Sequence, residues 1–366
     1  MKIKAAVIEA PGAPYKVEEL ELADPREDEI LVKIVASGLC GTDEHAHQAH
    51  FPVPMPIVLG HEGAGIVEAV GSAVDDIKVG DHVVITYGTC GECKPCQEDR
   101  LYACEKWPMV NFGGRMADGY TPLSRDGEEI GDFFAQGSFA SHCVAKAKSA
   151  AVIDPDFDLE IAGPLACGMQ TGAGIVMNCL KMQEKPGQSF AVFGCGSVGM
   201  AAIMAAKIAG AETIIAVGGN PDSLELAKEL GATHTINRKE VDSIVDAIHA
   251  ICPFGVENAL DTSGHPKMVM DMLHSTCFCG KDVVAGACDL ENFSLPMDLG
   301  QKTLYGVSMG WTHPKEFIPQ LIEYYKQGKF PYDKLITKFP FSKINDVFPA
   351  SAAGEIIKGV VVMDFE

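Results

Sequence analysis

Residues 189–199 read SFAVFGCGSVG, an apolar run followed by three spaced glycines. Ser189 to Phe193 is predicted to be a strand, and Val198 to Ile208 is predicted to be a helix of small and apolar residues. The glycines allow a tight turn and a close approach of the backbone, and the helix N-terminus would face a pyrophosphate. The pattern G-x-G-x-x-G between a strand and a helix therefore predicts dinucleotide binding. A glycine-rich packing turn is the alternative. The predicted cofactor residues of this turn are Gly194, Gly196, Ser197, Val198 and Gly199.

Strands and helices continue to alternate after this turn. Thr213 to Val217 is β-branched, and Asn220 followed by proline is typical of a helix start, with Asn as the N-cap. This helix is expected to run to about Leu230 and to stop at Gly231. Further strands are expected at Val256–Leu260 and Asp282–Ala285. Such alternation predicts a parallel sheet with right-handed crossovers.

The end of the second strand bears on the choice of cofactor. An acidic residue there would bind the ribose hydroxyls of NAD and repel the 2′-phosphate of NADP. This chain has Gly218-Gly219-Asn220 at that point, and Asp222 fits the first turn of the helix instead. Gly218 and Asn220 are therefore candidate cofactor contacts, and a preference for NADP or dual use is expected. Arg238 could fold nearby and bind the phosphate.

The rest of the chain has a different composition and residue pattern. Residues 1 to about 150 are rich in Gly, Pro, His and Cys, with short apolar runs typical of strands and long loops. A helix at Lys315–Gln327 and a last strand at Gly359–Met363 follow the parallel-sheet region. We expect a cofactor domain over residues 169–308, inserted into a β-rich domain built from residues 1–168 and 309–366. The short apolar runs are Ile30–Ile34, Ile66–Val67, Val83–Ile85 and Phe139–Val144.

Composition excludes several classes of function. The 366 residues contain 29 Lys and Arg against 50 Asp and Glu, a formal net charge of −21, which disfavours nucleic acid and anionic membrane partners. No apolar run approaches the roughly 18 residues of a membrane helix, and the N-terminus does not resemble a signal peptide. The 13 cysteines are an odd number and cannot all form internal disulfides. A reducing, cytoplasmic location is expected, where clustered thiols suggest metal binding or catalysis.

Four of these cysteines form an array with the spacing C-x2-C-x2-C-x7-C. Four thiolates in a short loop can close a tetrahedral zinc site that has no open position. Free thiols and an iron–sulfur cluster are the alternatives. Such a site would be structural, because the protein fills every position around the metal. The array consists of Cys90, Cys93, Cys96 and Cys104.

A second group of possible ligands is spread along the chain. Cys40 lies in a Cys-Gly-Thr-Asp segment and His61 in a Gly-His-Glu segment. Cys167 lies where the β-rich N-terminal region gives way to the parallel-sheet region. Two cysteines and one histidine would leave a fourth position for water or substrate. The surrounding pattern, Gly60-His-Glu-x2-Gly65-x5-Gly71-x2-Val, is specific.

On these residues the chain resembles the zinc-dependent medium-chain alcohol dehydrogenases over nearly all of its length. The resemblance implies an α/β fold with a GroES-like β-rich catalytic domain and a Rossmann doubly wound parallel-sheet domain. It also implies that Cys40, His61 and Cys167 bind a catalytic zinc, with Glu62 and Asp43 in or near the shell that orients these ligands.

The same resemblance assigns a proton path and a cofactor contact. Thr42 occupies the family's proton-relay position, and His45 the position that passes the proton to solvent. A hydroxyl at a strand end and an exposed loop histidine are the alternative interpretations. Lys358 matches a basic residue that reaches the pyrophosphate, although it could be a solvated lysine. Some relatives carry Arg where this chain has Gly41, so that phosphate contact must come from elsewhere.

Further segments resemble the aryl-alcohol (benzyl alcohol) dehydrogenase branch. They are Phe112–Arg115, Gln136–Ala140, Glu316–Pro319 and Phe330–Ile336. An apolar pocket over the zinc would suit benzyl, allylic or medium-chain alcohols, and the methyl group of Thr42 favours primary over secondary ones. Candidate lining residues are Tyr87, Phe112, Met297 and Met309.

The expected activity is the interconversion of primary alcohols and aldehydes with NAD(P), one catalytic zinc and one structural zinc per chain. A polyol dehydrogenase and a glutathione-dependent formaldehyde dehydrogenase are alternatives that share the zinc residues. A zinc- and nucleotide-binding module without activity is the alternative from a different class. The expected partners are a small-molecule substrate and copies of the same chain in a homodimer or homotetramer.

Overall fold

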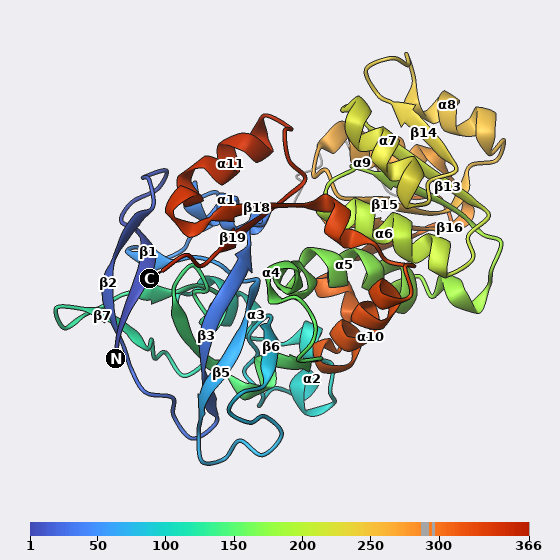
Figure 1. Ribbon diagram of the computed structural model, residues 1–366. Coiled ribbons are helices and arrows are strands. Elements are labelled where there is room, and N and C mark those ends of the chain that lie inside the picture. The colour runs from blue at the N-terminus through green and yellow to red at the C-terminus, as the bar shows by residue number, and fades with distance from the viewer. Residues whose placement is uncertain (287–292, 295–296, 366) are drawn as a thin grey trace. The chain divides into compact units, whose positions relative to one another are not determined.

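The computed structural model describes residues 1–286, 293–294 and 297–365 (Figure 1). The chain divides into two compact units. Unit 1 comprises residues 1–167, 313–323 and 333–366, and unit 2 comprises residues 168–312 and 324–332. Unit 1 is therefore built from both ends of the chain, and the architecture is the expected α/β fold.

Unit 2 contains a parallel sheet with the strand order β14-β13-β12-β15-β16-β17. This order reverses direction at β12, the first strand, as in a doubly wound sheet that binds dinucleotides at the switch point. Helices cover the sheet (Figure 1), and the central strands β12, β13 and β15 are mostly buried, whereas the edge strands β14 and β17 are partly exposed. They are β12 Ser189–Phe193, β13 Thr213–Gly218, β14 His234–Asn237, β15 Val256–Asp261, β16 Thr276–Val284 and β17 Thr303–Gly306.

Helix α7, Pro221–Leu230, begins and ends where its local sequence predicts. The side chain of Asn220 accepts hydrogen bonds from the backbone of Asp222 and Ser223, and Gly231 ends the helix with a φ of 134°. Both ends of this helix were expected. The α-helices of this part of the chain are α5 Gly168–Gly174, α6 Ser197–Ile208, α7 Pro221–Leu230, α8 Ile244–Ile251 and α9 Pro266–Ser275, and a single-turn helix η7 covers Met309–Trp311.

Unit 1 contains two sheets of short strands. The first has the order β8-β7-β2-β1-β4-β9, and the second has the order β11-β6-β5-β3-β19-β18, with β10 also paired to β3. Its strands are β1 Lys2–Ile8, β2 Lys16–Leu22, β3 Glu29–Gly38, β4 Ile57–Val58, β5 Gly63–Val70, β6 His82–Ile85, β7 Leu123–Arg125, β8 Glu128–Glu129, β9 Gly131–Asp132, β10 His142–Lys146, β11 Ala150–Ile153, β18 Ile336–Pro340 and β19 Lys358–Val362.

Two expectations for individual elements were incomplete. The segment after Cys40 forms a helix, α1, where sequence analysis expected loops between strands. Strand β16 begins at Thr276, earlier than the expected start at Asp282, and its partner strand shifts register between Val256 and Asn258. The other α-helices of the described chain are α1 Gly41–His47, α2 Lys94–Gln97, α3 Trp107–Phe112, α4 Leu159–Ala162, α10 Pro314–Lys326 and α11 Ile344–Ala352. Helix α10 begins in unit 1 and ends in unit 2.

Strand β19 joins the C-terminal segment to the N-terminal part of unit 1. It pairs antiparallel with β3 and parallel with β18, and Val360 and Val361 are fully buried. Burial of such side chains stabilises a sheet by roughly 1.5–3 kcal/mol each. Within the described residues, none of the helices is both long and apolar enough to cross a membrane.

Candidate active site and zinc centres

Four possible metal ligands converge inside unit 1. The ligand atoms of Cys40, His61, Glu62 and Cys167 all lie within 4.8 Å of one another. Cys40 directly precedes α1, the adjacent His61 and Glu62 directly precede β5, and Cys167 follows the short helix η4 Gly163–Ala166. Three separate chain segments thus supply the group, which the sequence had suggested through its resemblance alone.

Asp43 holds this group in position from the first turn of α1. One carboxylate oxygen accepts a hydrogen bond from the backbone of Cys40 at 3.0 Å. The other accepts one from the backbone of Gly60 at 3.0 Å and lies 3.0 Å from Nδ1 of His61. Asp43 is fully buried, so its orientation is fixed. It therefore sets the rotation of the imidazole, as a carboxylate beside a metal-binding histidine does.

The donor set fits a zinc ion. Because Nδ1 of His61 faces Asp43, the other ring nitrogen points away, and it is buried with no hydrogen-bond partner among the described residues. The Sγ atoms of Cys40 and Cys167 are 4.0 Å apart. A hydrogen bond with the Cys167 thiol lowers the pKa of Cys40 well below its ordinary value. Burial alone would lower the pKa of His61, but Asp43 and Cys40 raise it to about 10, so a metal ion that bound here would displace a ring proton. One imidazole and two sulfur donors are ligands that zinc prefers.

Glu62 forms a buried ion pair with Lys358 at the start of β19. The Nζ atom of Lys358 lies 2.7 Å from one Glu62 oxygen and 2.6 Å from the other, and it also donates to the carbonyl of Leu39 at 3.0 Å. Burial raises the pKa of Glu62, and the Lys358 ammonium offsets part of this rise. Lys358 is only 1% exposed, so it is not the solvated lysine that was the alternative interpretation. Its contact with a cofactor stays a prediction.

Helix α1 also carries the two residues of the expected proton path. The Thr42 hydroxyl oxygen lies 3.7 Å from Sγ of Cys40, at the edge of the ligand group. His45 is exposed one turn later, and its Nδ1 is 2.9 Å from Nδ1 of His50. The helix therefore places one hydroxyl beside the metal ligands and one imidazole at the surface.

Aromatic rings line one side of the ligand group. The ring of Phe134 stacks on His61 with a centroid distance of 4.5 Å. Phe112 contacts Phe134 edge to face at 5.6 Å, and Phe51 lies 4.7 Å from Phe112. The buried Phe133 contacts both Phe112 and His61. We call Phe51, Phe112, Phe133 and Phe134 the aromatic cluster.

Sequence analysis identified only one member of the aromatic cluster, Phe112. No sequence signal identifies Phe134. Its unusual feature is a backbone φ of 56°, which a bulky residue rarely adopts and which only the structure shows. Of the other expected lining residues, Tyr87 is buried and packs on Trp107, and Met297 is 81% exposed. Met309 is buried within unit 2.

The four cysteines of the array also lie close together in the structure. The sulfur atoms of Cys90, Cys93, Cys96 and Cys104 all lie within 4.8 Å of one another. The Sγ atom of Cys90 is 3.5 Å from that of Cys104 and 4.0 Å from that of Cys96. The backbone N–H of Cys93 donates to the sulfur of Cys90. Four sulfurs at these spacings suit a structural zinc ion with no open position.

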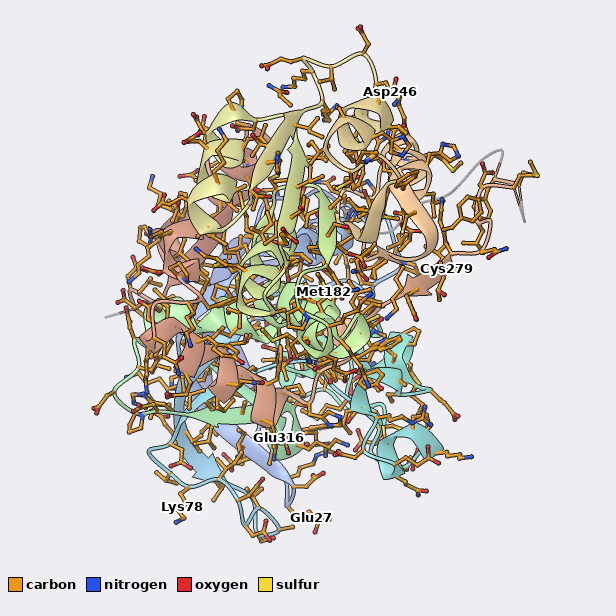
Figure 2. The ribbon with its side chains drawn as sticks, turned by 90° about the vertical axis from the view of Figure 1, so that its right-hand side faces the viewer. Glu27, Lys78, Met182, Asp246, Cys279 and Glu316 are labelled. Carbon is orange, nitrogen blue, oxygen red and sulfur yellow. The ribbon has the colours of Figure 1, made fainter. Side chains whose placement is uncertain are left out.

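The remaining described cysteines are separate thiols. Cys143 and Cys179 are buried, Cys195 lies in the glycine-rich turn, and Cys279 is exposed at the surface of β16, where Figure 2 labels it. Cys288 lies outside the described residues. The interpretation of these thiols as residues without metal roles stays a prediction.

The glycine-rich turn forms part of the lining of a pocket within unit 2. This pocket has a volume of about 530 Å³, and its lining includes Gly194, Gly218, Asn220 and Arg238. A Cβ atom on Gly199 would approach the carbonyl oxygen of Gly194 to 1.9 Å, so only glycine allows this close packing of helix and turn. A Cβ atom on Gly219 would lie 2.9 Å from Nε of Arg238, so the guanidinium is beside the end of β13. Ser197 and Val198 occupy the first turn of α6.

Comparisons with known proteins agree with this geometry. Residues 26–155 match the alcohol dehydrogenase GroES-like domain, and residues 197–326 match the zinc-binding dehydrogenase domain. The chain is 39% identical to a geraniol dehydrogenase of Castellaniella defragrans, over 98% of this chain and 97% of the relative. The chain belongs to the zinc-binding alcohol dehydrogenase family.

Solved structures of alcohol dehydrogenases share the fold over the whole chain. An alcohol dehydrogenase zinc-binding domain protein from Burkholderia ambifaria is 45% identical, covers 100% of both chains and has a TM-score of 0.95. The benzyl alcohol dehydrogenase of Acinetobacter calcoaceticus is 41% identical, covers 99% of both chains and has a TM-score of 0.94. This chain is thus a zinc-dependent alcohol dehydrogenase that uses zinc and NAD(P), as its sequence suggested.

Proposed function

We propose that this alcohol dehydrogenase interconverts primary aryl or allylic alcohols and their aldehydes, with Cys40, His61 and Cys167 as the ligands of the catalytic zinc. The stacking of Phe134 on the His61 ring carries the proposal, because it places the aromatic cluster beside the expected ligands. Flat apolar substrates pack favourably on such rings. The similarity to a geraniol dehydrogenase and a benzyl alcohol dehydrogenase also supports it.

The residues of this chain would act on the proton and on the position of the substrate. A bound zinc ion supplies a Lewis acid that makes an alcohol hydroxyl more acidic, and NAD(P) supplies the hydride acceptor. Thr42 would accept the alcohol proton while its own hydroxyl proton moves on toward His45, which would pass a proton to solvent at the surface. Asp43 would keep His61 in one orientation, and the aromatic cluster would exclude water.

An activity panel tests the substrate class. We expect kcat/KM for benzyl alcohol and for geraniol to exceed the value for a bulky secondary alcohol by roughly tenfold or more, since Thr42 and the aromatic cluster narrow the site. A polyol and the glutathione adduct of formaldehyde represent the alternative activities. A higher kcat/KM for either one, or equal turnover of the secondary alcohol, would contradict the proposal.

We further propose that the enzyme prefers NADP over NAD. The observation that supports this preference is the position of Arg238 beside Gly219, together with a lack of any acidic side chain at Gly218–Asn220. An arginine there can bind a 2′-phosphate, and no carboxylate at the strand end would repel it. Comparing kcat/KM with the two cofactors tests the preference, and a strong advantage for NAD would contradict it.

The cofactor domain, assembly and location of the enzyme are also proposals. We propose that residues 169–308 form the dinucleotide-binding domain, that copies of the chain assemble as a homodimer or homotetramer, and that the enzyme works in the cytoplasm. The edge strand β17 supports assembly, because a strand that ends a sheet can pair with another chain. Sedimentation equilibrium at several concentrations measures the mass of the assembly, and a monomer throughout would contradict the proposal.

A further inference from the structure

Two histidines of unit 1 contact each other at the end of α1, and the proposed proton path contains only the first of them. Nδ1 of His45 lies 2.9 Å from Nδ1 of His50, and the centroids of the two rings are 5.2 Å apart. Both side chains are exposed. Neither histidine belongs to the two groups of expected metal ligands. The second imidazole therefore lies beside the outlet of the path without an assigned role.

The backbone at the end of α1 brings these two side chains together. The N–H of His50 donates to the carbonyl of His45 at 2.9 Å, and the N–H of Ala49 donates to the carbonyl of Ala46 at 3.0 Å. Ala49 has a φ of 54°, in the left-handed region. These features define a Schellman motif, in which the side chains of the first and the sixth residue often contact each other. The fold of the helix end therefore sets the contact between the two imidazoles.

The residue after His50 anchors the same segment from its other side. The ring centroid of Phe51 lies 6.2 Å from that of His45 and 4.7 Å from that of Phe112. Phe112 is the last residue of α3 and belongs to the aromatic cluster. The segment that carries His50 is thus packed against both α1 and α3. This packing restricts the movement of His50 away from His45.

The distance between the two rings shows that they share a hydrogen. Two nitrogen atoms 2.9 Å apart form a hydrogen bond, so one hydrogen lies between the two Nδ1 atoms. Two lone pairs or two N–H groups would repel each other there, and this holds for a neutral pair and for a pair with one positive charge. An imidazole can receive a proton on one ring nitrogen and release the proton of the other. A proton can therefore pass from one ring to the next.

The contact also determines which nitrogen of His45 is left for the inner part of the path. Because Nδ1 of His45 faces His50, Nε2 is the nitrogen that remains for a proton arriving from Thr42. Thr42 lies three residues earlier in α1, so the two side chains share one face of the helix. A proton that arrives on Nε2 leaves the ring from Nδ1, and there it meets His50 rather than water. The exposed ring of His50 has its own Nε2 left for water.

We propose that His50 is the outer member of the proton path and takes the alcohol proton from His45. The inference rests on the proposed function, in which Thr42 and His45 carry this proton. Protonation of Nε2 makes His45 an imidazolium, its Nδ1–H bond breaks, and that proton forms an N–H bond with Nδ1 of His50. The Nε2 proton of His50 then passes to a water molecule, so one proton and one positive charge leave the protein. Because both rings are exposed, exchange with water restores the starting tautomers.

His50→Gln tests the proposal, because an amide can bond to His45 but does not carry a proton. The zinc-loaded enzyme is mixed with cofactor and the alcohol of highest kcat/KM in the activity panel, in weakly buffered solution. The rate constant for cofactor reduction in a single turnover should fall by roughly tenfold. His234→Gln is the matched control, at an exposed histidine of unit 2 outside the lining of the pocket at the glycine-rich turn, and should not alter the rate. An unchanged rate in His50→Gln would overturn the proposal.

Two further readouts distinguish proton transfer by His50 from a structural role at the helix end. Raising the HEPES concentration at constant ionic strength should restore the rate in His50→Gln, because a buffer base can take the proton from His45 directly. The solvent deuterium isotope effect on the rate should be larger in the variant than in the unchanged enzyme, because the exit of the proton then limits the rate more. A purely structural role would produce neither change. Absence of both changes would therefore overturn the proposal.

His45→Gln separates a failure of this inference from a failure of the proposed function. A lower rate in His45→Gln with an unchanged rate in His50→Gln would overturn the role of His50 alone. Unchanged rates in both variants would also contradict the proton path of the proposed function. A lower rate in His50→Gln with an unchanged rate in His45→Gln would overturn the inference as well, because His50 acts through His45.

Nitrogen-15 NMR tests the shared hydrogen without any turnover. In the zinc-loaded enzyme without alcohol or cofactor, the Nδ1 signal of His45 should shift in His50→Gln, because the ring that shares its hydrogen is gone. The same signal should stay in place in His234→Gln. An Nδ1 signal of His45 that is unchanged by His50→Gln would overturn the proposal.

Discussion

At the scale of single residues, the Asp43 carboxylate connects both metal-ligand segments that precede α1 and β5. It accepts from the backbone of Cys40 and Gly60 and faces the imidazole of His61. An amide at this position has only one acceptor oxygen, so at least one of these bonds would be lost, and it would carry no charge to orient the imidazole. We therefore expect the metal affinity of the site to depend on a residue that is not itself expected to bind zinc.

We predict that Asp43→Asn lowers kcat/KM for benzyl alcohol and zinc retention by roughly 10–100-fold, because the His61 ring loses its charged partner. Steady-state kinetics and metal analysis after dialysis against a chelator measure the two effects. Asp81→Asn is the control, since Asp81 also accepts a backbone N–H, from Lys78, but in an exposed turn. If the two variants kept the same activity and zinc content, Asp43 would have no orienting role.

Arg238 offers a test of cofactor preference at the same scale. We predict that Arg238→Gln lowers kcat/KM with NADP by roughly tenfold and changes the value with NAD little, because only NADP carries a 2′-phosphate for the guanidinium. Lys228→Gln is the control, because Lys228 lies on α7 paired with Glu225 and does not line the pocket. An equal loss with both cofactors would show that Arg238 acts on something other than the phosphate.

The sequence predicted the residues with specific spacing better than the residues that meet only in space. The spacing of the four clustered cysteines and the resemblance carried by the Gly-His-Glu segment predicted two groups of residues, and the structure brings each group together. Phe51 and Phe134 carry no such pattern, because their contacts with Phe112 join distant chain segments. The same reason explains why Lys358 was matched to a cofactor contact without its ion pair to Glu62.

At the scale of elements, a helix or strand was predicted correctly where its own ends carry a local sequence signal. Helix α7 has an Asn-Pro start and a glycine stop, so its bounds followed from the sequence. Helix α1 has no such start, because Cys40 is its N-cap and the side chain of Asp43 bonds back to it. A capping bond of this kind is recognised only once the backbone is known. Similarly, the early start of β16 depends on pairing with β15.

Strand β16 carries a buried carboxyl that makes the stability of unit 2 depend on pH. Burial raises the pKa of Asp282 to about 7, against a hydrogen bond from Thr276 and the charge of Lys302. A carboxyl with a raised pKa in the folded state binds more protons there than in the unfolded state. The contribution of protonated Asp282 to the free energy of unfolding is therefore fully present below about pH 4 and is lost as the pH rises through about 7.

We predict that Asp282→Asn flattens this dependence, since an amide does not ionise and can still accept from Thr276. The melting temperature of the unchanged enzyme should fall more between pH 5 and pH 8 than that of the variant. A shift of about three pKa units corresponds to about 4 kcal/mol as an upper limit. Calorimetry at the two values of pH measures the difference, and identical pH dependence in the two proteins would refute the assignment.

At the scale of the whole molecule, both metal centres belong to unit 1 and none of their residues belongs to unit 2. The two centres should nevertheless respond differently to removal of a ligand. The group around His61 is embedded among buried strands, whereas the four-cysteine array lies in a loop with little regular structure of its own. Metal binding in such a loop is coupled to its folding.

We predict about two zinc ions per chain in the purified enzyme and about one in Cys96→Ser. The melting temperature of Cys96→Ser should fall by about 5 °C or more, because the loop loses the metal that organises it. Cys279→Ser, at an exposed thiol outside both groups, is the control and should change neither value. Two zinc ions in Cys96→Ser would contradict the assignment of the array.

Because β19 pairs with β3, unit 1 can complete its folding only after the C-terminal end of the chain has been synthesised. Cys40, His61 and Cys167 emerge early, but the lysine that neutralises Glu62 beside them emerges only after all of unit 2 has been made. At about 5–20 residues per second, the roughly 190 residues from Cys167 to Lys358 take about 10–40 s. During that interval the sheet of unit 2 is completed when β17 ends at Gly306, while the end of β3 at Ala36–Gly38 lacks its partner strand and Glu62 lacks its lysine. Chaperone contacts and premature zinc capture should therefore concentrate on the first half of the nascent chain, which holds all the expected zinc ligands.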